Sequence, residues 1–242
     1  MAKKLNIASL EPKIIIEPVA NDDKRYIRCH ILIVCEGGKT EPNYFRSFSM
    51  MENSSGLVYQ VDTEGGKIST IQVVDKAIAL KQKAEKAKKP YDSVWAVFDR
   101  DSFKDTNFDK AINKANKNGI GCAWSNEAFE LWYVYHFDFR NTPMSRKDYE
   151  DIITKRVCAA GYRCGNKKYT YLKNDPKMRS ILRDCKCDEN LAIKCAERQS
   201  ETFIDNKFHD HNPCTMVYKL VRQLIGKDKE FINLVKSKLE EK

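Results

Sequence analysis

Ser93–Asp101, with the sequence SVWAVFDRD, is the most informative segment of this chain for predicting its fold. Its apolar centre has no polar alternation, which is typical of a strand buried on both faces of a parallel sheet. Asp99 and Asp101 follow at the carboxyl end, the edge at which open α/β sheets bind ligands. Carboxylates this close repel each other unless a cation lies between them, so we predict a hard divalent ion such as Mg²⁺ here. The alternative is a polar turn in which Asp99 caps the next element, because D-x-D has many accidental matches.

A second apolar strand is predicted at Tyr26–Cys35, directly before Glu36 in the segment EGGKTEP. Glu36 is therefore another acid at the carboxyl end of a buried strand. Thr40 is expected to be the N-cap of the following helix. The Gly-Gly-Lys-Thr run is not a P-loop, because the position where that motif needs its first glycine is Ile33, inside the strand.

Strands and helices alternate through the first part of the chain. Alternation of this kind predicts a parallel sheet with right-handed crossovers, an α/β fold of the Rossmann-like type flanked by helices. The remaining elements that we predict there are a strand at Leu57–Asp62, a helix from Ser69 or Thr70, a helix at Asn107–Lys117, a strand at Cys122–Trp124 and a buried helix at Asn126–Phe137.

The domain organisation follows from composition and charge. We expect an N-terminal arm at residues 1–25, an α/β core at 26–142 and a basic helical region at 143–242 that packs on the core. Residues 1–142 carry 21 Lys+Arg and 19 Asp+Glu, and residues 143–242 carry 22 and 15, so the net charges are +2 and +7 and give the +9 of the chain. An anionic partner should therefore meet the second half.

Cysteine usage and hydropathy limit the possible classes. The nine cysteines include no C-x-x-C pair, which argues against a zinc ribbon or a disulfide scaffold. A metal site built from Cys158, Cys164, Cys185, Cys187, His209 and His211 would have no common ligand spacing. No apolar run approaches the roughly 20 residues of a membrane span, and we expect a cytoplasmic protein without membrane contact.

The densest basic stretch is 155–186, which holds ten Lys+Arg and two Asp. Basic side chains interleaved with tyrosines suit a groove that follows a nucleic-acid backbone and stacks unpaired bases. The alternative is a solvated helical cap whose tyrosines pack inward. The residues proposed for nucleic-acid binding are Arg163, Lys167, Lys168, Tyr169, Tyr171 and Lys173.

Four segments in order carry a family resemblance: VCEGGKTEPNYF, VFDRDSF, NEAFELWYVYHF and NPCTMVYKLV. They span residues 31 to about 225, and on them the chain resembles the RloB family of bacterial and archaeal proteins. The resemblance implies a Toprim-like core, in which a Glu after the first strand and a D-x-D after a later strand hold divalent metal. Matched residue by residue, these are Glu36, Asp99 and Asp101. It also implies a role in antiviral defence, in some cases beside an ATPase partner.

Two departures from the family pattern, Gly38 and the pair Glu127-Ala128, leave the three acids unchanged. Glu41, Glu130 and His136 are weaker site candidates. Glu130 could hold metal, orient Lys39 or pair with a basic residue of the C-terminal region. His136, between two aromatic residues, is more typical of a hydrogen-bonded core histidine.

These observations favour a metal-dependent nuclease that acts on DNA or RNA. Glu36, Asp99 and Asp101 would hold Mg²⁺ or Mn²⁺, and Lys39 would offset charge on the scissile phosphate. The second hypothesis is a non-catalytic nucleic-acid-binding or sensor subunit that regulates an ATPase partner. Fold analogy alone does not decide between them.

Overall fold

The computed structural model describes residues 27–49, 55–66, 68–100 and 105–240. The expected arm at 1–25 and Asp101 lie outside these ranges. The central sheet has the strand order β2-β1-β3-β4, and every neighbouring pair is parallel. Its strands are β1 (Ile27–Cys35), β2 (Leu57–Gly65), β3 (Ser93–Val97) and β4 (Gly121–Cys122). The predicted α/β fold with a parallel, Rossmann-like sheet is confirmed.

The central strand β1 is buried on both faces, as its unbroken apolar run predicts. Ile31 and Ile33 pack into one hydrophobic cluster, and Leu32 and Val34 pack into another on the opposite face. The edge strand β2 instead alternates, with Leu57, Tyr59 and Val61 buried and the residues between them partly exposed. The difference follows from position, because only a central strand is covered by helices on both sides.

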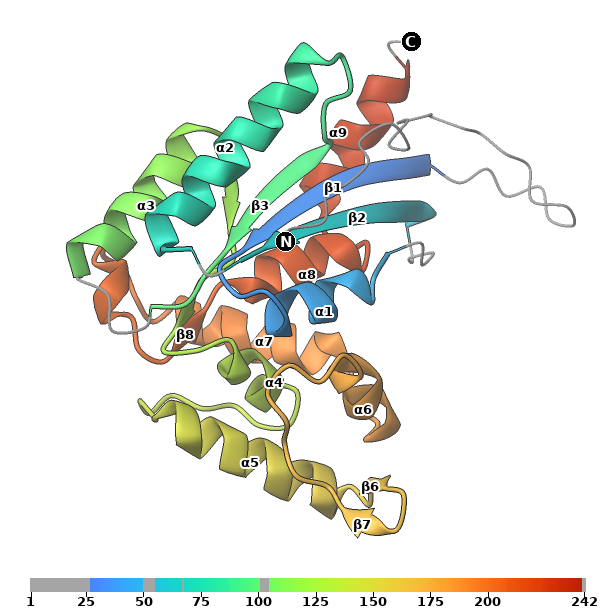
Figure 1. Ribbon diagram of the computed structural model, residues 1–242, viewed down its shortest axis with the longest axis vertical. Helices are drawn as coiled ribbons and strands as arrows, with labels where there is room; N and C mark the ends of the chain where they lie inside the picture. Colours follow the sequence, from blue (N-terminus) through green and yellow to red (C-terminus); the bar gives the residue numbers. More distant parts are fainter. Residues whose placement is uncertain (1–26, 50–54, 67, 101–104, 241–242) are drawn as a thin grey trace, which may run out of the picture.

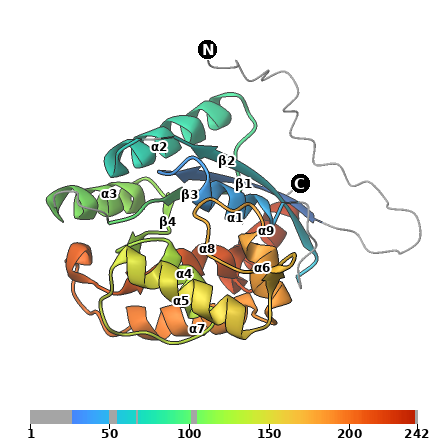
Figure 2. The same ribbon diagram turned by 60° about the horizontal axis from the view of Figure 1, so that its bottom comes forward.

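Helices cover the two faces of the sheet unequally. Helices α2 (Thr70–Lys86) and α3 (Asp105–Lys117) cover one face, while α1 (Thr40–Arg46), α8 (Val217–Leu224) and α9 (Lys229–Glu240) pack on the other (Figure 1). Beyond α1 and α8 lie further helices, which Figure 2 shows on the side of the sheet away from α2 and α3. They are α4 (Glu130–Tyr135), α5 (Arg146–Ala159), α6 (Met178–Asp184) and α7 (Glu189–Ser200).

The C-terminal region is part of the core that surrounds the sheet. Leu220 and Val221 of α8 belong to the same buried cluster as Ile31 and Ile33 of β1. The Tyr59 hydroxyl of β2 donates a hydrogen bond of 2.8 Å to the Gln223 carbonyl. This face of the sheet is therefore covered in part by residues that follow β1 and β2 by more than a hundred positions.

Two local expectations were wrong, and a third is confirmed with additions. The region after residue 143 is mainly helical, as expected, and contains α5 to α9. It also contains an antiparallel hairpin of β6 (Arg163–Cys164) and β7 (Lys167–Lys168), and its β8 (Cys214–Thr215) pairs with β5 (Ser125–Asn126). Because Ser125 and Asn126 are in a strand, the helix predicted from Asn126 begins only at Glu130. The N-cap of α1 is Lys39, not Thr40, because the Thr40 hydroxyl donates instead to Asn174.

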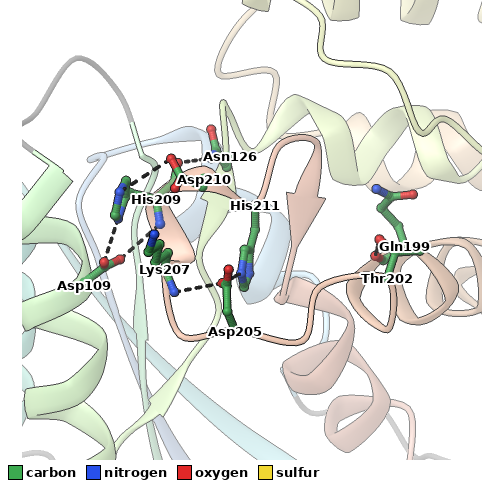
Figure 3. Close-up of polar contacts among 9 residues, drawn as sticks. All are labelled: Asp109, Asn126, Gln199, Thr202, Asp205, Lys207, His209, Asp210 and His211. Atoms are coloured by element: carbon green, nitrogen blue, oxygen red, sulfur yellow. Dashed lines mark hydrogen bonds and ion pairs between the residues drawn. The ribbon is translucent and has the colours of Figure 1, made fainter.

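The loop between α7 and β8 contains two histidine–carboxylate pairs (Figure 3). Nδ1 of His209 lies 2.6 Å from Oδ2 of Asp109 on α3, and the Asn126 side chain donates to the His209 carbonyl at 3.0 Å. His211 bonds Asp205 within the loop, at 2.8 Å. His209 therefore ties α3 to β5, and neither histidine shares a metal-binding cluster with cysteines among the described residues.

No helix in the described part of the chain has both the length and the apolarity needed to cross a bilayer.

Candidate functional site

The candidate site lies at the carboxyl edge of the sheet, between β1 and β3. The chain leaves β1 for β2 on one side and then returns across the sheet to β3 on the other. Such a reversal of strand order opens a crevice, which is where open α/β sheets bind their ligands. Glu36 follows β1 directly, and Asp99 follows β3 by two residues. The predicted convergence of these two acids at one edge is present.

A pocket of about 420 Å³ contains both acids. Oε2 of Glu36 accepts a hydrogen bond of 3.3 Å from the backbone N–H of Asp99. The side chain of Asp99 forms an ion pair, in which Oδ2 lies 3.6 Å from Nη2 of Arg146, the first residue of α5. The side chains of Asp99 and Arg146 are 14% and 29% exposed, so the ion pair is partly desolvated. The pocket is lined by Glu36, Gly37, Gly38, Lys39, Thr40, Glu41, Ile68, Ser69, Asp99, Arg146, Lys173 and Asn174.

Two lysines complete the charge of the pocket. Lys39 comes from the turn after β1, and Lys173 comes from the segment between β7 and α6. Within the described ranges, neither ammonium group has an ion-pair or hydrogen-bond partner. With Arg146, the pocket thus presents three cationic side chains beside three carboxyl groups. This mixture suits a phosphate ester and a hard cation in the same space.

Glu41 forms a buried wall of the pocket. Its side chain is 7% exposed, and its carboxylate lies where a Cβ on Gly37 would be. Burial raises the pKa of the Glu41 carboxyl, and the nearby Glu130 adds to the increase, while Lys173 and Arg146 oppose it. The missing side chain at Gly37 thus leaves the space that this carboxyl occupies, while a Cβ on Gly38 would meet nothing within 4 Å.

Asn174 connects the C-terminal region to the start of α1. It has a φ of +74°, in the left-handed region that Asn tolerates better than most residues. Its side-chain oxygen accepts from the Thr40 hydroxyl at 2.9 Å, and its carbonyl accepts from Asn43 at 3.1 Å. These bonds hold the Lys173 segment against the turn that carries Glu36.

The family model of RloB-like proteins matches residues 31–224. The chain belongs to this family. The match includes β3, the part of β1 from Ile31 onward and the C-terminal segments that supply Arg146 and Lys173. No curated protein and no solved structure matches the chain.

Two of the weaker candidates, Glu130 and His136, lie outside the pocket, in the core of this RloB-like protein. Glu130 is 2% exposed and accepts a hydrogen bond of 3.0 Å from the Tyr171 hydroxyl, so its partner from the C-terminal region is a tyrosine and not a basic residue, which was one of the alternatives for Glu130. His136 is also 2% exposed, and its Nδ1 bonds the Trp132 carbonyl at 2.9 Å. Burial lowers the pKa of His136 to about 4. His136 is therefore a hydrogen-bonded core histidine, the role that its position between two aromatic residues indicated.

The prediction that Tyr169 and Tyr171 stack on nucleic-acid bases is wrong. Tyr169 and Tyr171 are 3% and 8% exposed and belong to the main hydrophobic cluster, so their rings are not available to bases. They pack inward because the segment after β7 returns along α5, where the Tyr171 N–H donates to the Thr154 hydroxyl at 2.9 Å. The tyrosines therefore follow the alternative of an inward-packed cap.

The predicted basic residues divide into two groups. Arg163, Lys167 and Lys168 are exposed on the β6–β7 hairpin, while Lys173 lines the pocket. Arg146 is the first residue of α5, and the hairpin follows the end of this helix. The 14 residues of α5 therefore separate the hairpin from Arg146 by about 20 Å (Figure 1). Sequence analysis missed Arg146 and Asn174, which stand in polar segments without any motif.

Among the residues described, no group of three His, Cys, Asp or Glu is arranged to hold a metal ion. Asp101, the third predicted ligand, lies outside that set. The described pocket thus offers Glu36 and Asp99 as hard oxygen donors. Mg²⁺ commonly binds through one or two carboxylates, with waters and substrate phosphate completing its shell, so these residues fit Mg²⁺ or Mn²⁺.

Proposed function

We propose that this RloB-like protein is a metal-dependent nuclease that hydrolyses phosphodiester bonds of DNA or RNA, in antiviral defence. The observation that carries the proposal is the pocket in which Glu36 and Asp99, from neighbouring strands, lie beside Lys39, Arg146 and Lys173. Acids alone would suit many sites, and cations alone would suit any anion. Their combination at the crevice of a parallel sheet favours chemistry on a phosphate ester.

In this mechanism the acidic side chains bind the metal ion and the basic side chains bind the phosphate. Glu36, Asp99 and Asp101 would hold Mg²⁺ or Mn²⁺, and the ion would supply an activated water and stabilise charge on the leaving oxygen. Lys39 and Lys173 bind the non-bridging oxygens of the scissile phosphate. Arg146 pairs with Asp99 at 3.6 Å, so it orients that carboxylate and can donate to phosphate from the same place.

Glu41 contributes through its protonation state. Because burial raises the pKa of its carboxyl, Glu41 keeps its proton to a higher pH than an exposed glutamate does. A neutral Glu41 adds less repulsion to the site that holds Glu36 and Asp99. It also leaves a donor O–H at the pocket wall.

The test is a cleavage assay on the purified full chain. Single- and double-stranded DNA and RNA are incubated with Mg²⁺ or Mn²⁺, with the parent protein, with Asp99→Asn and with the exposed control Asp151→Asn. Asn keeps the shape of Asp but removes the charge that attracts a cation, so cutting should fall by a factor of about 100 or more while folding is retained. Asp151→Asn should cut like the parent. Equal cutting by Asp99→Asn would assign the activity to another site.

The Asp99–Arg146 ion pair also favours a second candidate function. An arginine that already neutralises Asp99 suits a non-catalytic nucleic-acid-binding or sensor subunit that acts on an ATPase partner. This candidate predicts no cleavage with any metal, and an Asp99→Asn variant as protective as the parent in a defence assay. The same two variants therefore separate the functions.

A further inference from the structure

A second cavity lies away from the Glu36–Asp99 pocket, where α8 meets α9 beside β3. It has a volume of about 470 Å³ and is lined by Trp95, Lys219, Arg222, Lys227, Lys229 and two acids, Asp228 and Glu230. It shares no lining residue with the first pocket. Its size lies within the range of roughly 300–1,000 Å³ that small-molecule sites occupy.

The charge of this cavity is positive, with four cationic side chains and two acidic ones. Arg222 already pairs with Glu197, and Lys227 donates to the Asn190 side chain. Asp228 is also engaged, because its Oδ1 accepts the Phe231 N–H at 3.0 Å at the start of α9.

Two cations of the cavity remain available to a ligand. In the described part of the chain, neither Lys219 nor Lys229 has an ion-pair or hydrogen-bond partner, and both are exposed. They come from two different helices and converge on one cavity. Asp228 and Glu230 also line the cavity, but its four cationic side chains outnumber these two acids, so a phosphate group is favoured between the two ammonium groups.

Trp95 gives the cavity an aromatic wall of fixed orientation. Its Nε1 donates to Oε1 of Gln223 at 2.6 Å, and a Cβ on Gly121 would lie 2.5 Å from its ring, so the ring rests on the backbone of β4. The ring is only partly buried, whereas Trp124 and Trp132 are 3% and 0% exposed. An aromatic ring beside lysines is the combination that binds a base and its phosphate together.

We propose that this cavity binds a nucleotide, with its base against Trp95 and its phosphate between Lys219 and Lys229. The shared chemistry is a nucleoside phosphate, which can come from a free nucleotide or from the end of a nucleic-acid strand. The proposal does not depend on the nuclease function, because it uses none of the residues of the first pocket.

The experiment uses the tryptophan fluorescence of the full chain. Of the three tryptophans, Trp95 alone lines this cavity, so ligand binding there should change its emission. ATP, AMP, inorganic pyrophosphate and a short single-stranded oligonucleotide are titrated separately in EDTA, and calorimetry measures the same affinities. The parent should bind ATP or the oligonucleotide saturably, with Kd below about 1 mM.

Charge reversal identifies the site. Lys219→Glu with Lys229→Glu should weaken binding at least tenfold, while Lys236→Glu with Lys238→Glu, exposed positions of α9 outside the cavity, should change it little. Lys39→Glu should leave the change in Trp95 emission unaltered even where calorimetry detects weaker binding at the first pocket, which separates the cavity from that pocket. Tighter binding of ATP than of the oligonucleotide would identify a free nucleotide as the source, and the reverse order would identify a strand end.

Two results would overturn the proposal. One is that neither the nucleotides nor the oligonucleotide bind saturably. The other is an equal loss of binding in the cavity variant and in the control variant of α9, which would mean that overall charge and not this cavity attracts the ligand.

Discussion

At the residue scale, the unusual group is the buried carboxyl of Glu41. Below about pH 4.5, its ordinary pKa, the carboxyl is protonated in both the folded and the unfolded chain, so its ionisation costs no stability. As the pH rises, the unfolded chain releases this proton first, because burial raises the pKa in the folded state. Stability is therefore lost as the pH rises towards the folded pKa, by about 1.4 kcal/mol for each pH unit between the unfolded and the folded pKa.

Glu41→Gln should remove this pH dependence. We expect the variant to be more stable than the parent at pH 7.5 and close to the parent at pH 4.5, because glutamine has no proton to lose as the pH rises. Urea unfolding at the two pH values measures the difference. Glu201→Gln, at an exposed position, is the matched control and should change stability little. An equal gain at both pH values would mean that ionisation of Glu41 is not the cause.

At the scale of elements, the turn after β1 shows what the glycines do. Gly37 and Gly38, which follow Glu36 directly, have different surroundings in the structure. Gly37→Ala would drive a Cβ into the Glu41 carboxylate, while Gly38→Ala would enter open space. We expect Gly37→Ala to cost about 1–3 kcal/mol of unfolding free energy and to reduce any activity of the pocket. Gly38→Ala should stay within about 0.5 kcal/mol of the parent. Thermal or urea unfolding of the pair tests this, and equal effects would contradict it.

The β6–β7 hairpin and the Lys173 segment should have separate effects on nucleic acid. Reversing Lys167 and Lys168 to Glu should weaken binding and lower the slope of log affinity against log salt by up to about 2, because each lost phosphate contact contributes roughly 0.7–0.9. Lys173→Glu should chiefly lower the cleavage rate at saturating substrate, because this side chain lines the pocket. Lys83→Glu with Lys86→Glu, on the exposed end of α2, is the control. An unchanged slope in the hairpin variant would show that the hairpin is only solvated.

At the scale of the whole molecule, the sequence predicts those features that depend on residues close together in the chain. The strands around Ile31–Cys35 and Ser93–Val97 were predictable because a continuous apolar run suits only a strand covered on both faces. The positions of Glu36 and Asp99 followed, because parallel strands place their carboxyl ends at one edge. Arg146 and Asn174 could not be predicted, because contacts with residues far away in the chain bring them to this edge.

The burial of the tyrosines has the same origin. Tyr169 and Tyr171 stand among lysines in the sequence, which is also the composition of a nucleic-acid groove. Only the path of the chain along α5 turns their rings inward, where Tyr171 reaches Glu130 from 41 positions away. Composition indicated the charge of this region correctly, but it could not indicate which side chains face solvent.

Glu36 and Asp99 are brought together by the whole fold, and we propose that they share one cation. The most direct measurement is Mn²⁺ binding to the full chain, followed by the loss of the electron paramagnetic resonance signal of free Mn²⁺. We predict that the parent and Asp151→Asn bind Mn²⁺ alike and that Asp99→Asn and Glu36→Gln each bind at least tenfold more weakly, because each loses one of the two anionic ligands. Undiminished Mn²⁺ binding by both Asp99→Asn and Glu36→Gln, or no binding by the parent, would contradict the claim.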